Sequence, residues 1–373
     1  MEYDPSTLSE GTIEASTWAL AAGSAQASPV VGSVNIVTSG SPTGSYRRRP
    51  SSDSSSSRIS GESIMGWNFD ALEYTSHTRG KPLSCMAREL FRINEGFFNG
   101  SYTSTSRDIV AALGIAEKEY NTYDGKVYQV AFHTKSHGAD VMQAFHYFLR
   151  CTPGLLDAIT PSLPEAVSPQ LVLIAALFAA ASHDLGHFGL DKDFLKKTQH
   201  PLSWISENQS VLESYHAASA LELLRRSNLV EGTMTGADFK FFKQLVVELI
   251  LATDLARHFD MMASPPALSD YMGTLRIAIH CADVSNVARP LSVSQKWTDL
   301  VMHEFFAQGD LEREKGLPVT PIMDRTSANT ARVQLGFIDV ITRPLFLSLG
   351  SHLDVDECIV NLEEVARYWQ DQI

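Results

Sequence analysis

Residues 168–187 read SPQLVLIAALFAAASHDLGH and join an apolar segment to a polar cluster. We predict a helix over Ser168–Ser182, and its run from Leu171 to Ala181 is apolar enough to be buried. Burying that helix carries the cluster that follows it into the interior, namely His183, Asp184 and His187. Imidazoles and a carboxylate cost free energy there unless cations or hydrogen bonds satisfy them. The stretch therefore predicts a polar site at the end of a buried helix.

Helical periodicity extends over most of the chain. From Trp67 onward, apolar residues recur at spacings of three and four, with few alternating β-branched runs. We expect helices over Leu83–Phe97, Asp108–Tyr120, Ala139–Leu149, Ser168–Ser182, Val211–Arg226, Asp238–Phe259, Tyr271–Asp283, Val293–Gln308 and Ala328–Leu349. No joint between them is long enough to mark a second domain. The sequence predicts an all-α fold, a compact multi-helix domain over residues 63–373.

The first 62 residues have a different composition. They are rich in Ser, Gly, Thr and Ala, and they show no apolar periodicity. They include the basic patch Arg47–Arg49 and the serine-rich run Ser51–Ser57. Such a segment cannot bury enough apolar surface to fold, so we expect a disordered leader over residues 1–62. A phosphorylation site or a docking tag in the Arg-rich stretch is the alternative interpretation.

Charge and cysteine content exclude several classes of protein. The formal net charge of −13 argues against a nucleic-acid partner, because binding to phosphate backbones needs a basic face. The four cysteines contain no C-x-x-C pair, so neither a disulfide framework nor a thiolate zinc site is predicted. With 44% hydrophobic residues among 373, the chain can bury a core without such crosslinks.

The hydropathy pattern predicts no transmembrane segment. The longest apolar run, Leu171–Ala181, is shorter than the roughly 20 residues that a membrane-spanning helix needs. No Lys/Arg-led signal peptide opens the chain. We therefore expect a cytoplasmic protein.

A second histidine cluster lies about fifty residues before the first. His133 and His137 are four apart, so on a helix they share one face, with Asp140 near the same stripe. Farther along, Asp283 follows an apolar stretch and is expected to face the interior, although helix capping is an alternative role. Imidazoles and carboxylates without thiolates suit divalent metals that activate water. The sequence predicts a metal-dependent hydrolase.

Several longer stretches occur together in a fixed order. They are YQVAFH (128–133), SHD (182–184), VLE (211–213), LATD (251–254), HCADVSN (280–286), QKWTD (295–299), EFFAQGD (304–310) and QLGFID (334–339). In these stretches the chain, from about residue 69 to its C-terminus, resembles the catalytic domain of class I 3′,5′-cyclic nucleotide phosphodiesterases. The resemblance implies the all-α, HD-type fold of that family.

The resemblance also implies a two-metal centre. Zinc would be held by four side chains, His137, His183, Asp184 and Asp283. Asp184 would bridge to a second metal, magnesium or alternatively manganese, which is coordinated largely by waters. Three side chains would orient those waters, namely Glu213, His187 and Thr253. The implied nucleophile is a hydroxide activated by both metals.

His133 matches the family's proton donor to the leaving 3′ oxygen. This role needs an imidazolium near the phosphodiester, oriented by a neighbouring carboxylate. Glu213 is the first candidate for that carboxylate. The segment Ser210–Glu213 also suits a helix capping box, which is a structural explanation of the same glutamate.

A base pocket is implied near the C-terminus. Gln334 and Phe337 are three apart on a predicted helix and therefore face the same way. The resemblance makes Gln334 the hydrogen-bond partner of the base edge, with Phe337 stacking on one ring face and Val301 closing the other. Asn286 is a second expected contact to the base.

The chain departs from the family pattern at several positions. Phe132 and Thr134 stand where the family usually has Tyr and Asn. Gly186 and Phe188 stand where its second motif usually has Asp and Pro. Ser294 occupies a site that is often Tyr, which predicts a more open base pocket. The choice between adenine and guanine is therefore left open.

The leading function is hydrolysis of the cyclic nucleotide cAMP, with cGMP as a further candidate substrate, to the nucleoside 5′-monophosphate. This reaction would terminate cyclic nucleotide signalling. One alternative is a metal-dependent phosphohydrolase of linear nucleotides. Another is a catalytically weak cyclic-nucleotide-binding scaffold. A homodimer is compatible with the resemblance.

Overall fold

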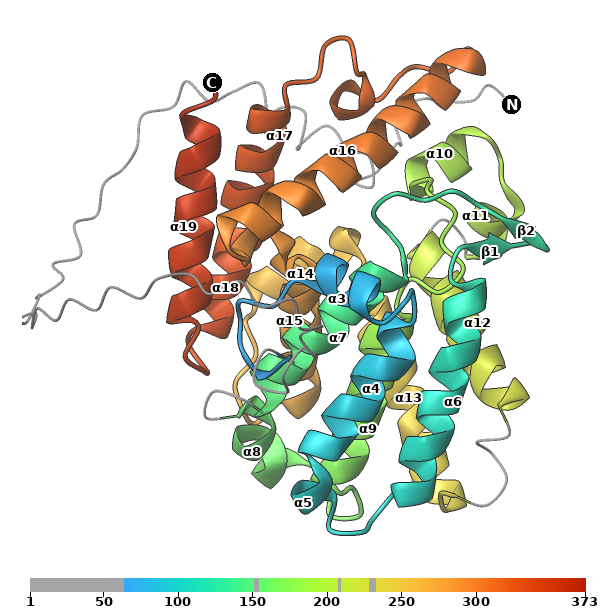
Figure 1. Ribbon diagram of the computed structural model, residues 1–373, viewed down its shortest axis with the longest axis vertical. Coiled ribbons are helices and arrows are strands. Elements are labelled where there is room, and N and C mark those ends of the chain that lie inside the picture. Colours follow the sequence, from blue (N-terminus) through green and yellow to red (C-terminus); the bar gives the residue numbers. More distant parts are fainter. Residues whose placement is uncertain (1–63, 151–153, 207–208, 228–232) are drawn as a thin grey trace, which may run out of the picture.

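The computed structural model describes residues 64–150, 154–206, 209–227 and 233–373, and these residues are predominantly helical (Figure 1). The predicted leader over residues 1–62 lies outside the described residues. The all-α fold class is confirmed. Within the described ranges, no helix combines the length and apolar character needed to cross a membrane.

The helices of the first half are α3 (Ala71–His77), α4 (Pro82–Ile93), α5 (Glu95–Phe98), α6 (Thr103–Glu119), α7 (Lys135–Arg150), α8 (Leu155–Ile159), α9 (Pro169–Ser182), α10 (Lys192–Lys197), α11 (Pro201–Ile205) and α12 (Val211–Arg226). Those of the second half are α13 (Gly236–Leu251), α14 (His258–Ala263), α15 (Tyr271–Asp283), α16 (Leu291–Glu314), α17 (Thr330–Phe337), α18 (Arg343–Leu349) and α19 (Asp356–Gln370). Short 3₁₀ turns cover Thr160–Ser162, Leu255–Arg257, Ser285–Ala288 and Pro321–Met323.

Helix α9 forms the centre of the packing. Ser168 Oγ accepts a hydrogen bond from the Leu171 backbone N at 3.2 Å and so caps its first turn. Every residue from Leu171 to Ser182 is buried, because α6, α7, α12 and α13 all pack against this helix. A helix that is apolar on all sides is stable only when enclosed in this way. The predicted burial of the apolar run is correct.

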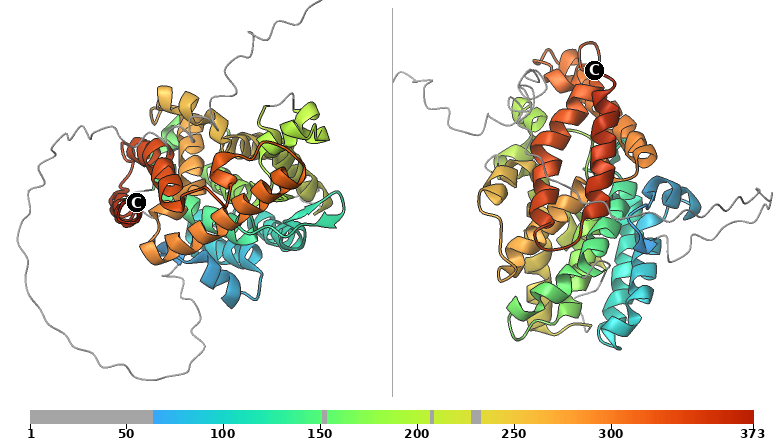
Figure 2. Two further views of the ribbon diagram at one scale, coloured as in Figure 1. Left: turned by 90° about the horizontal axis from the view of Figure 1, so that it is seen from above. Right: turned by 90° about the vertical axis from the view of Figure 1, so that its left-hand side faces the viewer.

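The C-terminal helices form a second layer beside this bundle. In Figure 1, α16 runs diagonally across one end of the molecule, from α19 toward α10. Figure 2 shows α19 lying alongside α17 and α18, and the contacts between these helices agree with that view. The layer brings residues of α16 and α17 over the end of the bundle where α9 terminates.

One hairpin interrupts the helical pattern. β1 (Thr122–Tyr123) pairs antiparallel with β2 (Lys126–Val127). The two residues between the strands, Asp124 and Gly125, have φ of +48° and +70°. Positive φ at both central positions is what a tight two-residue hairpin turn requires, and Asp-Gly is a favoured pair for it.

The expected helix Asp238–Phe259 is wrong as a single element. Helix α13 ends at Leu251, and the chain is extended at Asp254 (φ −62°, ψ 114°) before the next turn begins. Asp254 Oδ1 accepts a hydrogen bond from the Ala256 backbone N at 2.9 Å, so it caps the 3₁₀ turn and stops helix propagation. The break places Thr253 and Asp254 at the end of the bundle.

The expected helix Ala328–Leu349 is also divided. Helices α17 and α18 are separated by a π-helical segment, Ile338–Thr342. Pro344 lies at the start of α18 and has no backbone N–H to donate to the preceding turn. The π segment is the kind of local irregularity that absorbs such a missing hydrogen bond.

Asp140 does not lie with the histidines, contrary to the interpretation of a shared stripe. Its Oδ1 is 2.8 Å from Nη2 of Arg289, and both side chains are almost completely buried. Arg289 also donates to the Gln143 Oε1 at 2.8 Å and to the Trp67 carbonyl at 2.8 Å. Its guanidinium carbon lies 4.3 Å from the centroid of the Trp67 ring. This buried ion pair joins α7 to the segment before α16.

We predict that Asp140→Ala lowers the free energy of unfolding by about 3 kcal/mol or more, because it leaves the Arg289 charge buried without its carboxylate. Equilibrium urea denaturation measures the change. Asp299→Ala, at an exposed aspartate of α16, is the control and is expected to change stability by about 0.5 kcal/mol at most. Equal losses in both variants would contradict this role for Asp140.

Candidate metal and active site

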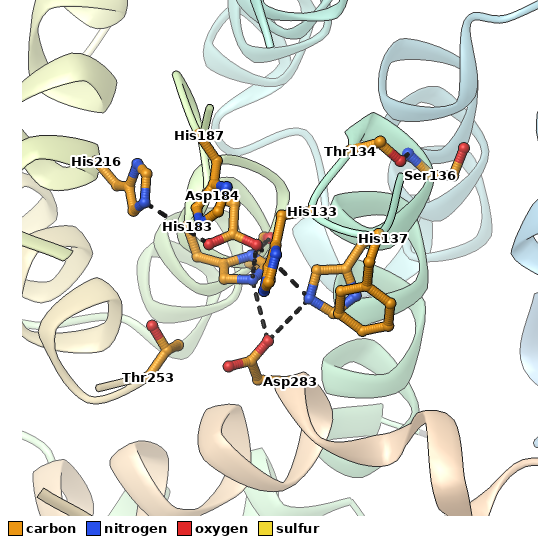
Figure 3. Close-up of polar contacts among 12 residues, drawn as sticks. His133, Thr134, Ser136, His137, His183, Asp184, His187, His216, Thr253 and Asp283 are labelled. Carbon is orange, nitrogen blue, oxygen red and sulfur yellow. Dashed lines mark hydrogen bonds and ion pairs between the residues drawn. The ribbon is translucent and has the colours of Figure 1, made fainter. Parts of the chain in front are cut away.

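Four side chains from three separate parts of the chain converge at the C-terminal end of α9 (Figure 3). His137 Nε2 lies 3.0 Å from Asp283 Oδ1 and 3.7 Å from Asp184 Oδ2. His183 Nε2 lies 3.1 Å from each of these two oxygens. The exposed fraction of the four side chains is between 1% and 18%. The structure thus brings together all four residues expected to hold zinc.

These four residues fit a metal ion. Ligand atoms about 2.0–2.2 Å from a tetrahedral zinc lie a little over 3 Å from one another, which is close to the separations here. The Nδ1 of His183 contacts the Ala180 carbonyl oxygen at 2.8 Å, and this leaves Nε2 to face the acids. His183 Nε2 and Asp184 Oδ2 have no hydrogen-bond partner among the described residues. Buried polar atoms in this state fit a bound cation.

The electrostatics of the cluster point the same way. Burial alone would lower the pKa of His183, but Asp184 and Asp283 hold it well above its ordinary value. Burial alone would raise the pKa of Asp184, but His183 holds it well below its ordinary value. The cluster therefore keeps its acids ionised inside the protein. A bound zinc ion would take the place of the proton that these acids otherwise hold on His183, because a histidine ligates a metal through a neutral imidazole.

A second set of polar groups surrounds the other oxygen of Asp184. His216 Nε2 lies 3.8 Å from Asp184 Oδ1. Neither His216 Nε2 nor Glu213 Oε2 has a hydrogen-bond partner among the described residues. Burial and the neighbouring Asp254 raise the pKa of Glu213 to about 8. Burial lowers the pKa of His187 to about 3, so this imidazole is neutral at pH 7. Thr253 lies on the same side (Figure 3).

His133 pairs with Glu304. It precedes α7, so the interpretation that His133 and His137 share one helix face is wrong. The Glu304 Oε1 lies 2.5 Å from His133 Nδ1, and its Oε2 accepts hydrogen bonds from the backbone N of Phe132 and His133 at 2.7 and 3.2 Å. Glu304, and not Glu213, therefore orients this imidazole.

The ion pair shifts both ionisations. Burial would lower the pKa of His133, but the Glu304 carboxylate raises it to about 9. Burial would raise the pKa of Glu304, but His133 lowers it to about 2. At neutral pH the side chain of His133 is thus a cation, and its Nε2–H is available to donate a proton.

The capping-box explanation of Glu213 is not supported either. Ser210 makes no side-chain capping bond to α12. Its Oγ instead donates to Asp254 Oδ2 at 2.8 Å. Glu213 is therefore left facing the cavity beside Asp184 and Thr253.

One cavity of about 330 Å³ joins these groups to the expected base pocket. Its lining includes His133, the acids Asp184 and Asp283, and four residues expected to contact a base, Gln334, Phe337, Val301 and Asn286. Gln334 is buried, and its Oε1 accepts a hydrogen bond from Thr298 Oγ1 at 3.2 Å. Ser294 is fully buried and is not among the residues that line this cavity, so the expectation that a serine at this position opens the base pocket stays a prediction.

Comparison with known proteins decides the family. A family model described as 3′5′-cyclic nucleotide phosphodiesterase matches residues 132–364. The chain belongs to this family. It is 31% identical to the 3′,5′-cyclic-AMP phosphodiesterase 4C of Mus musculus over an alignment of 332 residues, and the match covers 84% of this chain and 46% of that protein.

Two further relatives of this phosphodiesterase-family chain agree. A Drosophila melanogaster 3′,5′-cyclic-AMP phosphodiesterase, isoform F, is 30% identical over 332 residues, 82% of this chain and 47% of that protein. The chain thus spans about half the length of these curated relatives. The solved structure of LmjPDEB1 in complex with IBMX superimposes with a TM-score of 0.68 at 27% identity, covering 83% of this chain and 92% of that one.

Sequence reasoning about this phosphodiesterase-family chain missed two residues of the site. Glu304 lies 171 positions from His133, and no local spacing connects them. Asn121 Nδ2 donates to the carbonyl oxygens of His133 and His187 at 2.7 and 2.9 Å and so ties the two histidine segments together. A neutral amide before a hairpin has no pattern that distinguishes it from an ordinary turn residue.

We predict that Glu304→Gln moves the basic limb of the pH profile of kcat/KM to lower pH by about one unit or more. The protonated form of His133 is lost as pH rises through its pKa, and without the carboxylate that pKa falls because burial is no longer opposed. The control is Glu314→Gln, at an exposed residue of the same helix. An unchanged basic limb in Glu304→Gln would rule out this pairing as the source of the shift.

Proposed function

We propose that this chain hydrolyses 3′,5′-cyclic nucleotides, with cAMP as the first candidate substrate, to nucleoside 5′-monophosphates, and so ends cyclic nucleotide signalling. One observation carries the proposal: an oriented histidine cation, a buried His/Asp cluster and a Gln/Phe pair open on the same cavity. The names of the mammalian and insect relatives also support a cyclic-AMP substrate.

In this proposal, residues 63–373 form the catalytic domain, and His137, His183, Asp184 and Asp283 hold zinc. Magnesium, or manganese, binds on the other side of Asp184, where Glu213, His187 and Thr253 orient its water ligands. Bound there, the two cations would supply a water of lowered pKa and positive charge beside the phosphate.

The protein's own groups complete the reaction. As the water oxygen bonds to phosphorus and releases one proton to solvent, the bond from phosphorus to the 3′ oxygen breaks, and His133 Nε2–H gives its proton to that oxygen. A proton from solvent then restores the His133 cation. Glu304 holds Nδ1 of the ring, so the imidazole keeps its direction throughout. The products are a 5′-phosphate and a free 3′-hydroxyl.

Base recognition uses the remote end of the cavity. Gln334 is fixed by Thr298 and presents its amide to the base edge. Phe337 and Val301 offer apolar surfaces to the two ring faces, and Asn286 offers a further polar contact. Binding energy gained here positions the phosphate at the cation site.

Kinetics on cAMP, cGMP and a linear nucleotide test the function directly. The purified protein is treated with a chelator and assayed with and without added zinc and magnesium. Metal-dependent turnover of a cyclic nucleotide is expected. Turnover of the linear substrate alone would replace this proposal with a linear-nucleotide hydrolase, and binding without turnover would replace it with a scaffold.

The cellular setting is also part of the proposal. We propose a cytoplasmic location, where a cyclic nucleotide messenger would be met, and no nucleic-acid partner, in keeping with the net charge of −13. A homodimer is proposed as the assembly to test by analytical ultracentrifugation. Cell fractionation tests the location.

We predict that His133→Ala lowers kcat by roughly 10²–10⁴-fold while bound zinc stays at the wild-type level. Asp283→Ala, by contrast, is expected to lose both turnover and zinc, because it removes a ligand. Elemental analysis of the purified variants gives zinc per chain, and steady-state kinetics gives kcat. Near-normal zinc and activity in Asp283→Ala would refute its place in the metal site.

We predict that Gln334→Ala raises KM more than it lowers kcat, because the lost hydrogen bonds lie far from the reacting phosphate. Arg332→Ala, at an exposed residue of the same helix, is the control and should change neither constant. Equal effects of Gln334→Ala on both constants would argue against a role confined to base binding.

A further inference from the structure

A lysine lies in the acidic part of the cavity. Lys192 begins α10, its side chain is 24% exposed, and it lines the same cavity as Glu213 and Asp184. Its Nζ lies 3.5 Å from Oδ1 of Asp254, which is buried. The chain thus places an ammonium group beside the acids that would surround a second metal ion.

Two acids that line the cavity, Asp254 and Glu213, interact electrostatically with this ammonium group. Asp254 is held rigidly, since Oδ2 accepts from Ser210 Oγ and Oδ1 from the Ala256 backbone N. Glu213 is partly buried and lines the same cavity, and desolvation together with repulsion from Asp254 raises its pKa. Lys192 acts on Glu213 in the opposite direction and favours its ionised form. The positive charge of Lys192 therefore stabilises the ionised forms of Asp254 and Glu213 when no divalent cation is near.

We infer that Lys192 is a positioning residue that competes electrostatically with the second divalent cation and sets how tightly that cation is held. This inference rests on the proposed function, because it concerns the magnesium side of the same site. The ammonium group neutralises carboxylates that the cation would otherwise neutralise, and it repels the incoming ion. Both effects weaken binding of the second metal.

A direct contact of Lys192 with the substrate phosphate is the competing explanation. That role would require the ammonium group to leave Asp254, whose rigid position favours the pairing seen here. The two explanations give different results. A phosphate contact affects KM and not the affinity for metal, whereas competition affects the affinity for metal in the absence of substrate.

Binding of Mn²⁺ to the zinc-loaded protein tests the inference without any turnover. Titration followed by electron paramagnetic resonance gives the dissociation constant for wild type, Lys192→Gln and Lys192→Arg. We expect Lys192→Gln to bind Mn²⁺ about tenfold more tightly, because one nearby positive charge is gone. Lys192→Arg keeps the charge and should stay within about threefold of wild type.

Lys196→Gln is the matched control. Lys196 lies on the same helix, 4.0 Å from Asp193, and does not line the cavity, so removing its charge tests for a general effect of net charge. Tighter binding in Lys192→Gln but not in Lys196→Gln supports the inference. Unchanged or weaker binding in Lys192→Gln overturns it while leaving the proposed function intact. Absence of any Mn²⁺ binding to wild type overturns both.

Discussion

The central constraint on this fold is the cost of ending an enclosed apolar helix in charged groups. Helix α9 is buried along its length, so His183 and Asp184 enter the interior wherever that helix is packed. Their free energy is acceptable only with partners nearby. Helices α7 and α15 meet this need, because they bring His137 Nε2 to 3.7 Å from Asp184 Oδ2 and Asp283 Oδ1 to 3.1 Å from His183 Nε2. The packing of α9 in the core therefore also places the side chains of the site.

Two separate charge arrangements serve the two tasks at the site. The His/Asp cluster concentrates negative charge for a cation, whereas Glu304 is matched one-to-one with His133. In the His/Asp cluster, some buried polar atoms have no hydrogen bond. In the second arrangement, both carboxylate oxygens of Glu304 accept hydrogen bonds. An acid paired in this way holds a proton on its histidine. Both arrangements line the same cavity.

Apolar periodicity and residue spacing predicted the features that depend on neighbouring residues in the sequence. The helices Val211–Arg226 and Tyr271–Asp283 have the expected bounds, and the cluster after α9 could be found because four-residue spacing follows an unmistakable apolar run. Asp140 shows the limit: its spacing suits the histidine stripe, yet Arg289, 149 positions away, binds it. Burial can be predicted from hydropathy, but the identity of a distant partner cannot.

The break at Thr253 and Asp254 was missed for the same reason. Nothing in the apolar periodicity interrupts there, and the hydrogen bond from Ser210 that holds Asp254 comes from another helix. Glu304 is a similar case, because its carboxylate takes its role from three atoms of a distant loop. The resemblance to a family supplied the site's members, but only the structure gives their pairing.

The two proposed cation positions differ in how much they depend on the core, because the helix break at Thr253 and Asp254 lies beside only the second of them. The first is built on the end of α9, where any change of ligand disturbs the most tightly packed helix of the molecule. The second borders a helix terminus and the short helix α10, which lie at the edge of the bundle. If the proposed ions bind there, substitutions near the surface would be able to change the choice of the second ion, whereas changes at the first would also disturb the packing of α9.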